Sequence, residues 1–148
     1  MNVHTTRFGE IEVDETRTIN LPSGLLGFSE HHHYTLLQPD DDGIFFWFQS
    51  LEAPELAFVV TDPSLWVPEY QATIRPEQMA ELGLGQLDDA QIMVIVNRYG
   101  DTLTANLQGP VVINVNNRIA VQLVLAEKRW STRHEIVRLG ESVRAASA

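Results

Sequence analysis

The sequence predicts a mainly β protein: a small, single-domain, antiparallel β-barrel-like fold with one short helix. Segments rich in β-branched and aromatic residues recur at intervals of about 8–12 residues, and Gly, Asp and Asn separate them. Only one stretch combines the start and stop residues of a helix. Strands at this spacing favour a barrel or a sandwich over a parallel α/β sheet. A chain of 148 residues with 44% hydrophobic residues can form the core of one domain.

The first third of the chain predicts short strands joined by tight turns. Asp42-Gly43 separates the segments 33–38 and 44–50. An Asp-Gly pair is favoured where both central residues of a hairpin turn need positive φ, so we predict a hairpin there. Prolines interrupt residues 63–68, which therefore predict no long strand.

The helix is predicted at residues 76–82. Pro76 suits the first helical turn, and Gly83 is a stop signal. Residues 84–90 follow as a loop, and they lead into an apolar segment, 92–96, that predicts a buried strand.

Two more hairpins are predicted in the second half of the chain. The turns and the segments that they join are Tyr99-Gly100-Asp101 between 92–98 and 103–107, and Asn116-Asn117 between 111–115 and 118–125. Three hairpins indicate an antiparallel meander. We place the domain at residues 1–138 and expect a flexible C-terminal tail at 139–148, because that segment has few large apolar residues.

Composition excludes several classes of protein. The chain has no cysteine, so disulfide frameworks and thiolate zinc sites are excluded. The longest purely apolar run, 92–96, is far shorter than the roughly 18 residues of a membrane helix. The N-terminus lacks the basic and apolar regions of a secretory signal. These features predict a cytoplasmic protein that does not span a membrane.

The formal net charge of −10 is unevenly distributed along the chain. Residues 1–101 hold 17 acidic and 4 basic residues (−13), whereas residues 102–148 hold 3 acidic and 6 basic residues (+3). Nucleic acids are bound by clustered Lys and Arg, so we predict no direct nucleic-acid binding. A basic protein is the partner that an acidic surface favours.

Three sequence motifs follow one another in a fixed order. They are LPSGLLGF at residues 21–28, FWFQSL at 46–51 continued by ELAFVVTDP at 55–63, and TANLQGPVVIN at 104–114. The last motif combines Asn and Gln side chains, a Gly-Pro break and an apolar strand. Together the motifs resemble the flagellar assembly factor FliW family, and the resemblance extends over residues 2–137.

This resemblance implies a β-barrel-like fold and a function in flagellar assembly without catalysis or a cofactor. The implied partners are flagellin and the RNA-binding translational repressor CsrA. Antagonism of CsrA would couple the flagellin level to flagellin translation, and the free protein is expected to be a monomer. Two alternatives stay open: a small β-barrel enzyme or ligand-binding protein, and a flagellin chaperone with no regulatory partner.

The aromatic run at residues 45–48 is a candidate docking surface. Alternation along a strand places Phe46 and Phe48 on one face and the other two aromatic side chains on the opposite face. One pair can fill the core while the other meets a partner, or both pairs can be structural. We name Phe46 and Phe48 as candidate partner-binding residues.

Four residues of the last motif are further candidates: Asn106, Gln108, Pro110 and Asn114. The three amide side chains can brace buried backbone groups or bind a partner's backbone. A proline cannot donate to a central ladder, so Pro110 predicts a strand start or an exposed edge. We place these residues on or behind a partner-facing edge.

Neither of two suggestive runs predicts a metal site. In the histidine run 31–33, alternate side chains point to opposite faces, which leaves two possible ligands on one side. The aspartate run 40–42 lacks the ligand spacing of a calcium loop. The chain has no nucleophile elbow, dinucleotide fingerprint or phosphate-binding loop. We therefore predict neither a metal site nor an enzyme.

Overall fold

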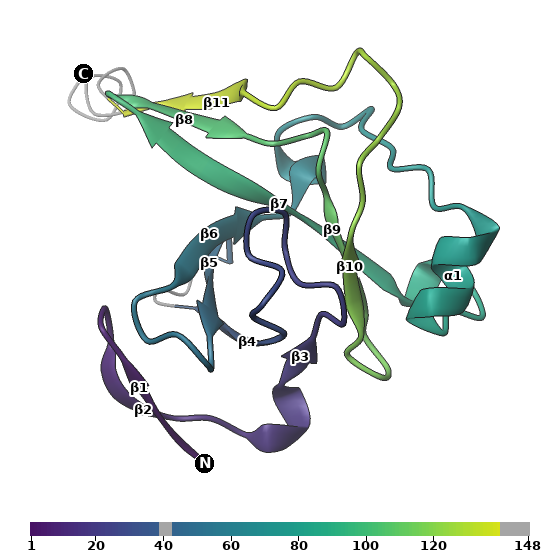
Figure 1. Cartoon of the computed structure of the whole chain (residues 1–148). Helices are drawn as coiled ribbons and strands as arrows, with labels where there is room; N and C mark the ends of the chain where they lie inside the picture. Colours follow the sequence, from purple (N-terminus) through teal and green to yellow (C-terminus); the bar gives the residue numbers. More distant parts are fainter. Residues whose placement is uncertain (39–42, 140–148) are drawn as a thin grey trace.

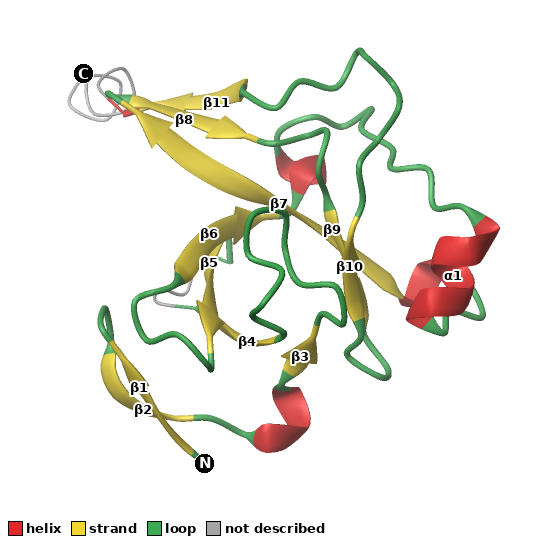
Figure 2. Cartoon of the chain, in the orientation of Figure 1, coloured by secondary structure: helices red, strands yellow, loops and turns green. Residues whose placement is uncertain are grey.

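The computed structural model describes residues 1–38 and 43–139 and confirms the mainly β, antiparallel fold (Figures 1 and 2). Two sheets are formed: a curled sheet of nine strands and a separate two-stranded hairpin. The strands are β1 (Asn2–Thr5), β2 (Gly9–Glu12), β3 (Ile19–Asn20), β4 (His33–Leu37), β5 (Phe45–Ser50), β6 (Ala57–Thr61), β7 (Ala90–Tyr99), β8 (Thr102–Ala105), β9 (Val111–Asn114), β10 (Ala120–Gln122) and β11 (His134–Arg138).

Strand β7 connects the two parts of the large sheet. Its first residues, 90–93, pair with β9, and its last residues, 96–99, pair with β8. The strand order is β10-β9-β7-β6-β5-β4-β3, and β11 continues from β8. In Figure 1 the far end of β7 projects with β8 and β11 from the rest of the sheet, at the upper left. We call these three strand segments the arm.

The three predicted hairpins are confirmed by strand pairing. Strands β4 and β5, β7 and β8, and β9 and β10 are antiparallel neighbours. Gly100 has a φ of +64° in the turn between β7 and β8, a conformation that glycine adopts without a steric penalty. In the turn of the first hairpin, Gly43 has a φ of +68°, and residues 39–42, which include the aspartate run 40–42, lie outside the described residues.

The predicted helix is confirmed as α1 (Pro76–Leu82). The Gln78 side chain accepts a hydrogen bond of 2.8 Å from the backbone N–H of Arg75, which fixes the first turn. Gly83 ends the helix in the left-handed conformation, with φ at +68°. Where proline predicted no long strand, Pro63–Leu65 form a 3-10 helix, and the Asp62 side chain caps it by accepting from the N–H of Ser64.

Strand β11 was not predicted from the sequence. It pairs with β8, and its register shifts between Glu135 and Val137. A bulge of this kind breaks the alternation of side chains that identifies a strand. It also protects the outer edge of the arm, because a kinked edge is a poor template for pairing with another chain.

The two faces of the sheet carry different hydrophobic clusters. One contains Tyr34 and Phe48, whose rings stack with centroids 4.5 Å apart. The other lies between the sheet and α1 and contains Leu82, Leu107 and Trp130. The sheet is therefore an internal layer over much of its area. Among the described residues, no helix is long and apolar enough to cross a membrane.

Candidate partner-binding surface

The loop that contains the first motif, residues 21–28, is anchored at its base and exposed at its tip. Leu21 and Leu25 are buried in the core, whereas Leu26 and Phe28 expose 62% and 37% of their surface. The loop turns at Gly24, where φ is +67° and an added Cβ would lie only 2.6 Å from the carbonyl oxygen of Phe28. The tight turn therefore requires glycine and holds two apolar side chains toward solvent.

Gln122 joins this loop to the last motif. Its Oε1 accepts a hydrogen bond of 2.8 Å from the N–H of Leu26, and its Nε2 donates one of 2.9 Å to the carbonyl oxygen of Gly109. A Cβ on Gly109 would lie 3.1 Å from that same Nε2. The Asn106 side chain lies equally close, with its Nδ2 3.0 Å from that Cβ position, so the side chains of Asn106 and Gln122 both pack against the backbone of Gly109.

Phe28 joins the loop to the middle motif as well. Its ring meets that of Phe58, on β6, edge to face with centroids 5.1 Å apart, a favourable geometry for an aromatic pair. All three motifs therefore meet in one region. We call Leu26, Phe28 and Phe58 the motif surface; its side chains come from the first two motifs, and Gln122 attaches the last motif to the same loop.

The aromatic run 45–48 was predicted to place two residues on a docking surface, and for Phe48 the structure contradicts this. Phe48 is 2% exposed and belongs to the core. Phe46 packs against the same core and is half-buried. This face of β5 is covered because the 21–28 loop and β9 contribute Leu21, Leu25, Val111 and Ile113 to the same cluster. Both side chains therefore contribute mainly to stability.

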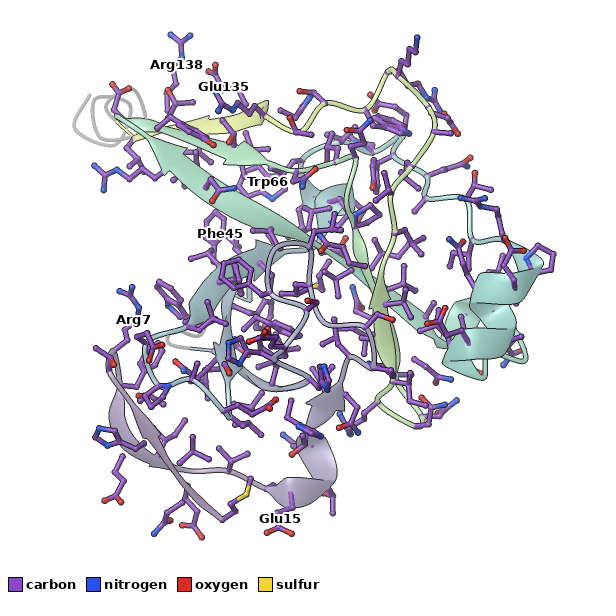
Figure 3. All side chains as sticks on the ribbon, viewed as in Figure 1. Arg7, Glu15, Phe45, Trp66, Glu135 and Arg138 are labelled. Carbon is purple, nitrogen blue, oxygen red and sulfur yellow. The ribbon has the colours of Figure 1, made fainter. Side chains whose placement is uncertain are left out.

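The opposite face of β5 carries aromatic residues that the sequence did not single out. Phe45 stacks on Trp66 with centroids 5.7 Å apart, and both rings are half-buried (Figure 3). Trp47 contacts Phe8, and the Arg7 guanidinium lies 4.2 Å from its ring centroid. Alternation along the strand already placed Phe45 and Trp47 on one face of β5. Only the folded chain shows that the β1–β2 hairpin partly covers this face.

The amide side chains of the last motif act largely as braces. Asn106 Oδ1 accepts from the backbone N–H groups of Gln108 and Gly109, at 3.2 and 3.0 Å. Asn114 is buried; it donates to Leu82 O and accepts from the N–H of Asn116, both at 2.9 Å. Of the two interpretations that the sequence left open for these residues, the hydrogen bonds support the structural one.

The other two candidates of that motif differ in exposure. Pro110 is buried and directly precedes β9, so it occupies the predicted strand start and not an exposed edge. Gln108 is half-buried, and its carbonyl oxygen accepts from the N–H of Leu125 at 2.8 Å. The Gln108 side chain makes no hydrogen bond within the described chain, so both its amide oxygen and its amide nitrogen are available to a partner.

The histidine run 31–33 organises a turn through Glu52. One oxygen of Glu52 accepts from the backbone N–H groups of His32 and His33, at 2.7 and 2.8 Å, and lies 3.2 Å from the His33 ring. Burial raises the pKa of the Glu52 carboxyl, but the hydrogen bonds outweigh it and the pKa is lowered. No group of three metal-binding side chains is found among residues 1–38 and 43–139.

Comparison with known proteins identifies the family. A family model described as FliW protein matches residues 2–136. The flagellar assembly factor FliW of Geobacter sulfurreducens is 42% identical over 136 residues, which cover 90% of this chain and 85% of the relative. The FliW of Syntrophus aciditrophicus is 41% identical over 140 residues, or 93% and 89% of the two chains.

A solved structure agrees with these sequence relatives. The crystal structure of a flagellar assembly factor FliW superimposes with a TM-score of 0.85 at 31% identity, and the match covers 93% of this chain and 97% of that one. Sequence and fold therefore match over nearly the whole length. This chain belongs to the FliW family of flagellar assembly factors.

Proposed function

We propose that this flagellar assembly factor binds flagellin and also binds and antagonises CsrA, and thereby couples the flagellin level to flagellin translation. The observation that carries the proposal is that the three motifs meet in one region, where the first two present the partly exposed apolar side chains of the motif surface. When flagellin is secreted, the factor is free to bind CsrA and relieves repression. When flagellin accumulates in the cytoplasm, it recaptures the factor.

Flagellin binding is supported by the chemistry of the motif surface. Leu26 and Phe28 present apolar side chains on a loop that is fixed by Gln122 and by the ring of Phe58. A rigid apolar surface suits the apolar face of an amphipathic segment that is disordered until it binds. A terminal segment of unassembled flagellin is the partner that we assign to it.

CsrA binding is supported by charge. The −13 balance of residues 1–101 favours a basic, RNA-binding partner through complementary potential. The factor need not fill the RNA-binding groove of that partner. An acidic protein bound beside the groove can exclude RNA by like-charge repulsion or by a change of shape, and linkage then makes the two ligands weaken each other.

Calorimetry with cognate flagellin tests the first part of this proposal. Leu26→Ser should weaken flagellin binding about tenfold or more, which corresponds to about 1.4 kcal/mol. Leu87→Ser is the matched control, because Leu87 is 59% exposed, close to the 62% of Leu26, and lies outside the three motifs. Equal affinities for the two variants would remove the motif surface as the flagellin site. Flagellin that lacks its terminal segments should not bind.

An RNA-release assay tests the second part. Added to a complex of CsrA with a labelled leader RNA, the factor should release the RNA, and added flagellin should reverse the release. If flagellin binds but RNA is never released, the protein is a flagellin chaperone without a regulatory role.

A further inference from the structure

We propose that a groove beside α1, formed by residues outside the three motifs, accepts an extended peptide segment of a protein partner as an added β-strand. The groove has a volume of about 390 Å³. One wall is formed by Thr73, Arg75 and Gln78, and the other by residues 123–127. In Figure 1 the first wall is the teal chain that enters α1, and the second is the yellow-green chain that leaves β10.

The second wall continues the line of β10 as an open edge. The N–H groups of Leu123 and Leu125 donate to the carbonyl oxygens of Pro110 and Gln108, each at 2.8 Å. Since successive N–H groups of an extended chain point in opposite directions within the sheet, those of Val124 and Ala126 point away from the β9 side. Among the described residues, neither has an acceptor. Two alternate backbone donors are thus unpaired along this wall.

The chain that leads into the first wall and includes Thr73 is also unpaired, whereas the backbone of Arg75 is bonded within the first turn of α1. Residues 71–74 belong to no helix or strand, and their backbone groups make no hydrogen bond within the described chain. The segment is held by its side chains instead, because Ala72 and Ile74 pack against the same hydrophobic cluster as Leu123 and Leu125. The groove therefore has apolar side chains between the unpaired backbone of residues 71–74 and the unpaired N–H groups of Val124 and Ala126.

The unpaired backbone groups along the groove indicate that the ligand is an extended chain. Most backbone groups in folded proteins are paired, and an open strand edge is a template for another extended chain. Alternate donors are matched by the carbonyl oxygens of a second extended backbone, and not by a helix, whose carbonyl groups are already bonded. The outer edge of the arm is interrupted by the bulge in β11, whereas no bulge interrupts the edge at residues 123–126.

The side chains at the groove indicate the composition of the peptide. Val124 is 56% exposed at the rim, so it favours an apolar residue opposite. Arg75 lines the groove where α1 begins, and Glu127, the acidic residue of the other wall, is paired with Arg129 at 2.9 Å. The carboxylate oxygen closest to Arg75, from Glu77, is 3.9 Å away, a long and solvent-exposed pairing that leaves the guanidinium able to bind an acid. The ligand is an apolar, proline-free segment with an acidic residue at one end.

A nuclear magnetic resonance titration tests the site with a defined probe, a capped hexapeptide that alternates valine and threonine and ends in aspartate. We expect saturable shifts of the Val124 and Ala126 amide signals and slower hydrogen exchange of both, by about tenfold or more. The same hexapeptide with methyl groups on alternate backbone nitrogens should not bind, because it cannot form the ladder. Equal binding of both peptides, or shifts that avoid residues 123–127, would overturn the proposal.

Two substitutions of Val124 distinguish binding through its backbone N–H from binding through its side chain. Val124→Pro removes the N–H, and Val124→Ala keeps it while removing most of the side chain. We expect Val124→Pro to weaken peptide binding about tenfold or more and Val124→Ala about threefold or less. The opposite ranking would contradict backbone pairing. If Val124→Pro does not fold, the two peptides on the natural protein decide the question. Flagellin binding serves as a separate readout and should be unchanged in Val124→Ala.

Discussion

Asn106 holds the turn before β9 with a single side-chain oxygen, whereas Gln108 two residues later has no recorded side-chain hydrogen bond in the described chain. Asn106→Ala would leave two partly buried N–H groups without their acceptor, so we expect it to lower the free energy of unfolding by about 1–3 kcal/mol. Gln108→Ala should change that free energy by less than about 0.5 kcal/mol. Urea unfolding of both variants measures the difference. Equal losses would mean that Asn106 is not the brace.

Glu52 makes the stability of the turn at the histidine run depend on pH. Its pKa is lowered in the folded protein, so its contribution to stability is present at neutral pH and is lost as the pH falls through the folded pKa. We expect Glu52→Gln to be less stable than the natural protein at pH 7, with the difference shrinking below about pH 4. Thermal melts across pH measure this. Glu81→Gln is the control, since Glu81 is exposed and accepts no recorded hydrogen bond in the described residues. A difference that grows on acidification would contradict the account.

The loop at residues 21–28 contains two glycines, and a comparison of their alanine variants distinguishes the effect of backbone conformation from the effect of close packing. Gly24 and Gly27 both have positive φ, +67° and +84°. A Cβ on Gly24 would meet backbone at 2.6 Å, whereas nothing lies within 4 Å of one on Gly27. Either substitution places an alanine in a backbone conformation with positive φ and therefore strains the backbone. Gly24→Ala adds a clash with backbone atoms, which cannot rotate away as side-chain atoms can. We expect Gly24→Ala to be the less stable variant by about 1–3 kcal/mol in urea unfolding. A smaller loss for Gly24→Ala than for Gly27→Ala would show that the loop is not rigid.

Sequence patterns predicted the elements whose signals are local. The three hairpins and α1 follow from turn pairs and from Pro76 and Gly83, which act within a few residues. Strand β11 could not be predicted in this way, because its alternation is broken by the bulge and its partner β8 lies far back in the chain. The same limit applies to the aromatic run. Alternation grouped Phe46 with Phe48, but which face of β5 is covered depends on the distant 21–28 loop.

The sequence predicted the three motifs of the candidate site, but it could not show how their residues are arranged on the surface of the folded chain. The sequence left two roles open for the amides of the last motif, because the hydrogen bonds of Asn106 and Asn114 are not visible in it. Gln122 carried no signal, since a lone glutamine in a short strand is unremarkable. Its role appears only when residues 26 and 109 are brought together by the fold.

At the scale of the whole molecule, charge governs the approach of a basic partner. Residues 1–101 carry a balance of −13, and residues 102–148 carry +3. Because salt screens long-range attraction more than short-range contacts, raising the ionic strength from about 0.05 to 0.5 M should slow CsrA association about tenfold and change its dissociation much less. Stopped-flow mixing measures both rates. An association rate that is independent of salt would remove electrostatic steering from the account.

We propose above all that flagellin binds the motif surface, at which the three motifs meet, and hydrogen exchange on the saturated flagellin complex tests this most directly. The account predicts slower exchange at residues 24–30, at the Phe58 region of β6 and at residues 106–110, because these segments adjoin the motif surface. The groove at residues 123–127 should exchange as in the free protein. Protection confined to the Phe45 and Trp47 face, or to the arm, with residues 24–30 unchanged, would contradict the claim.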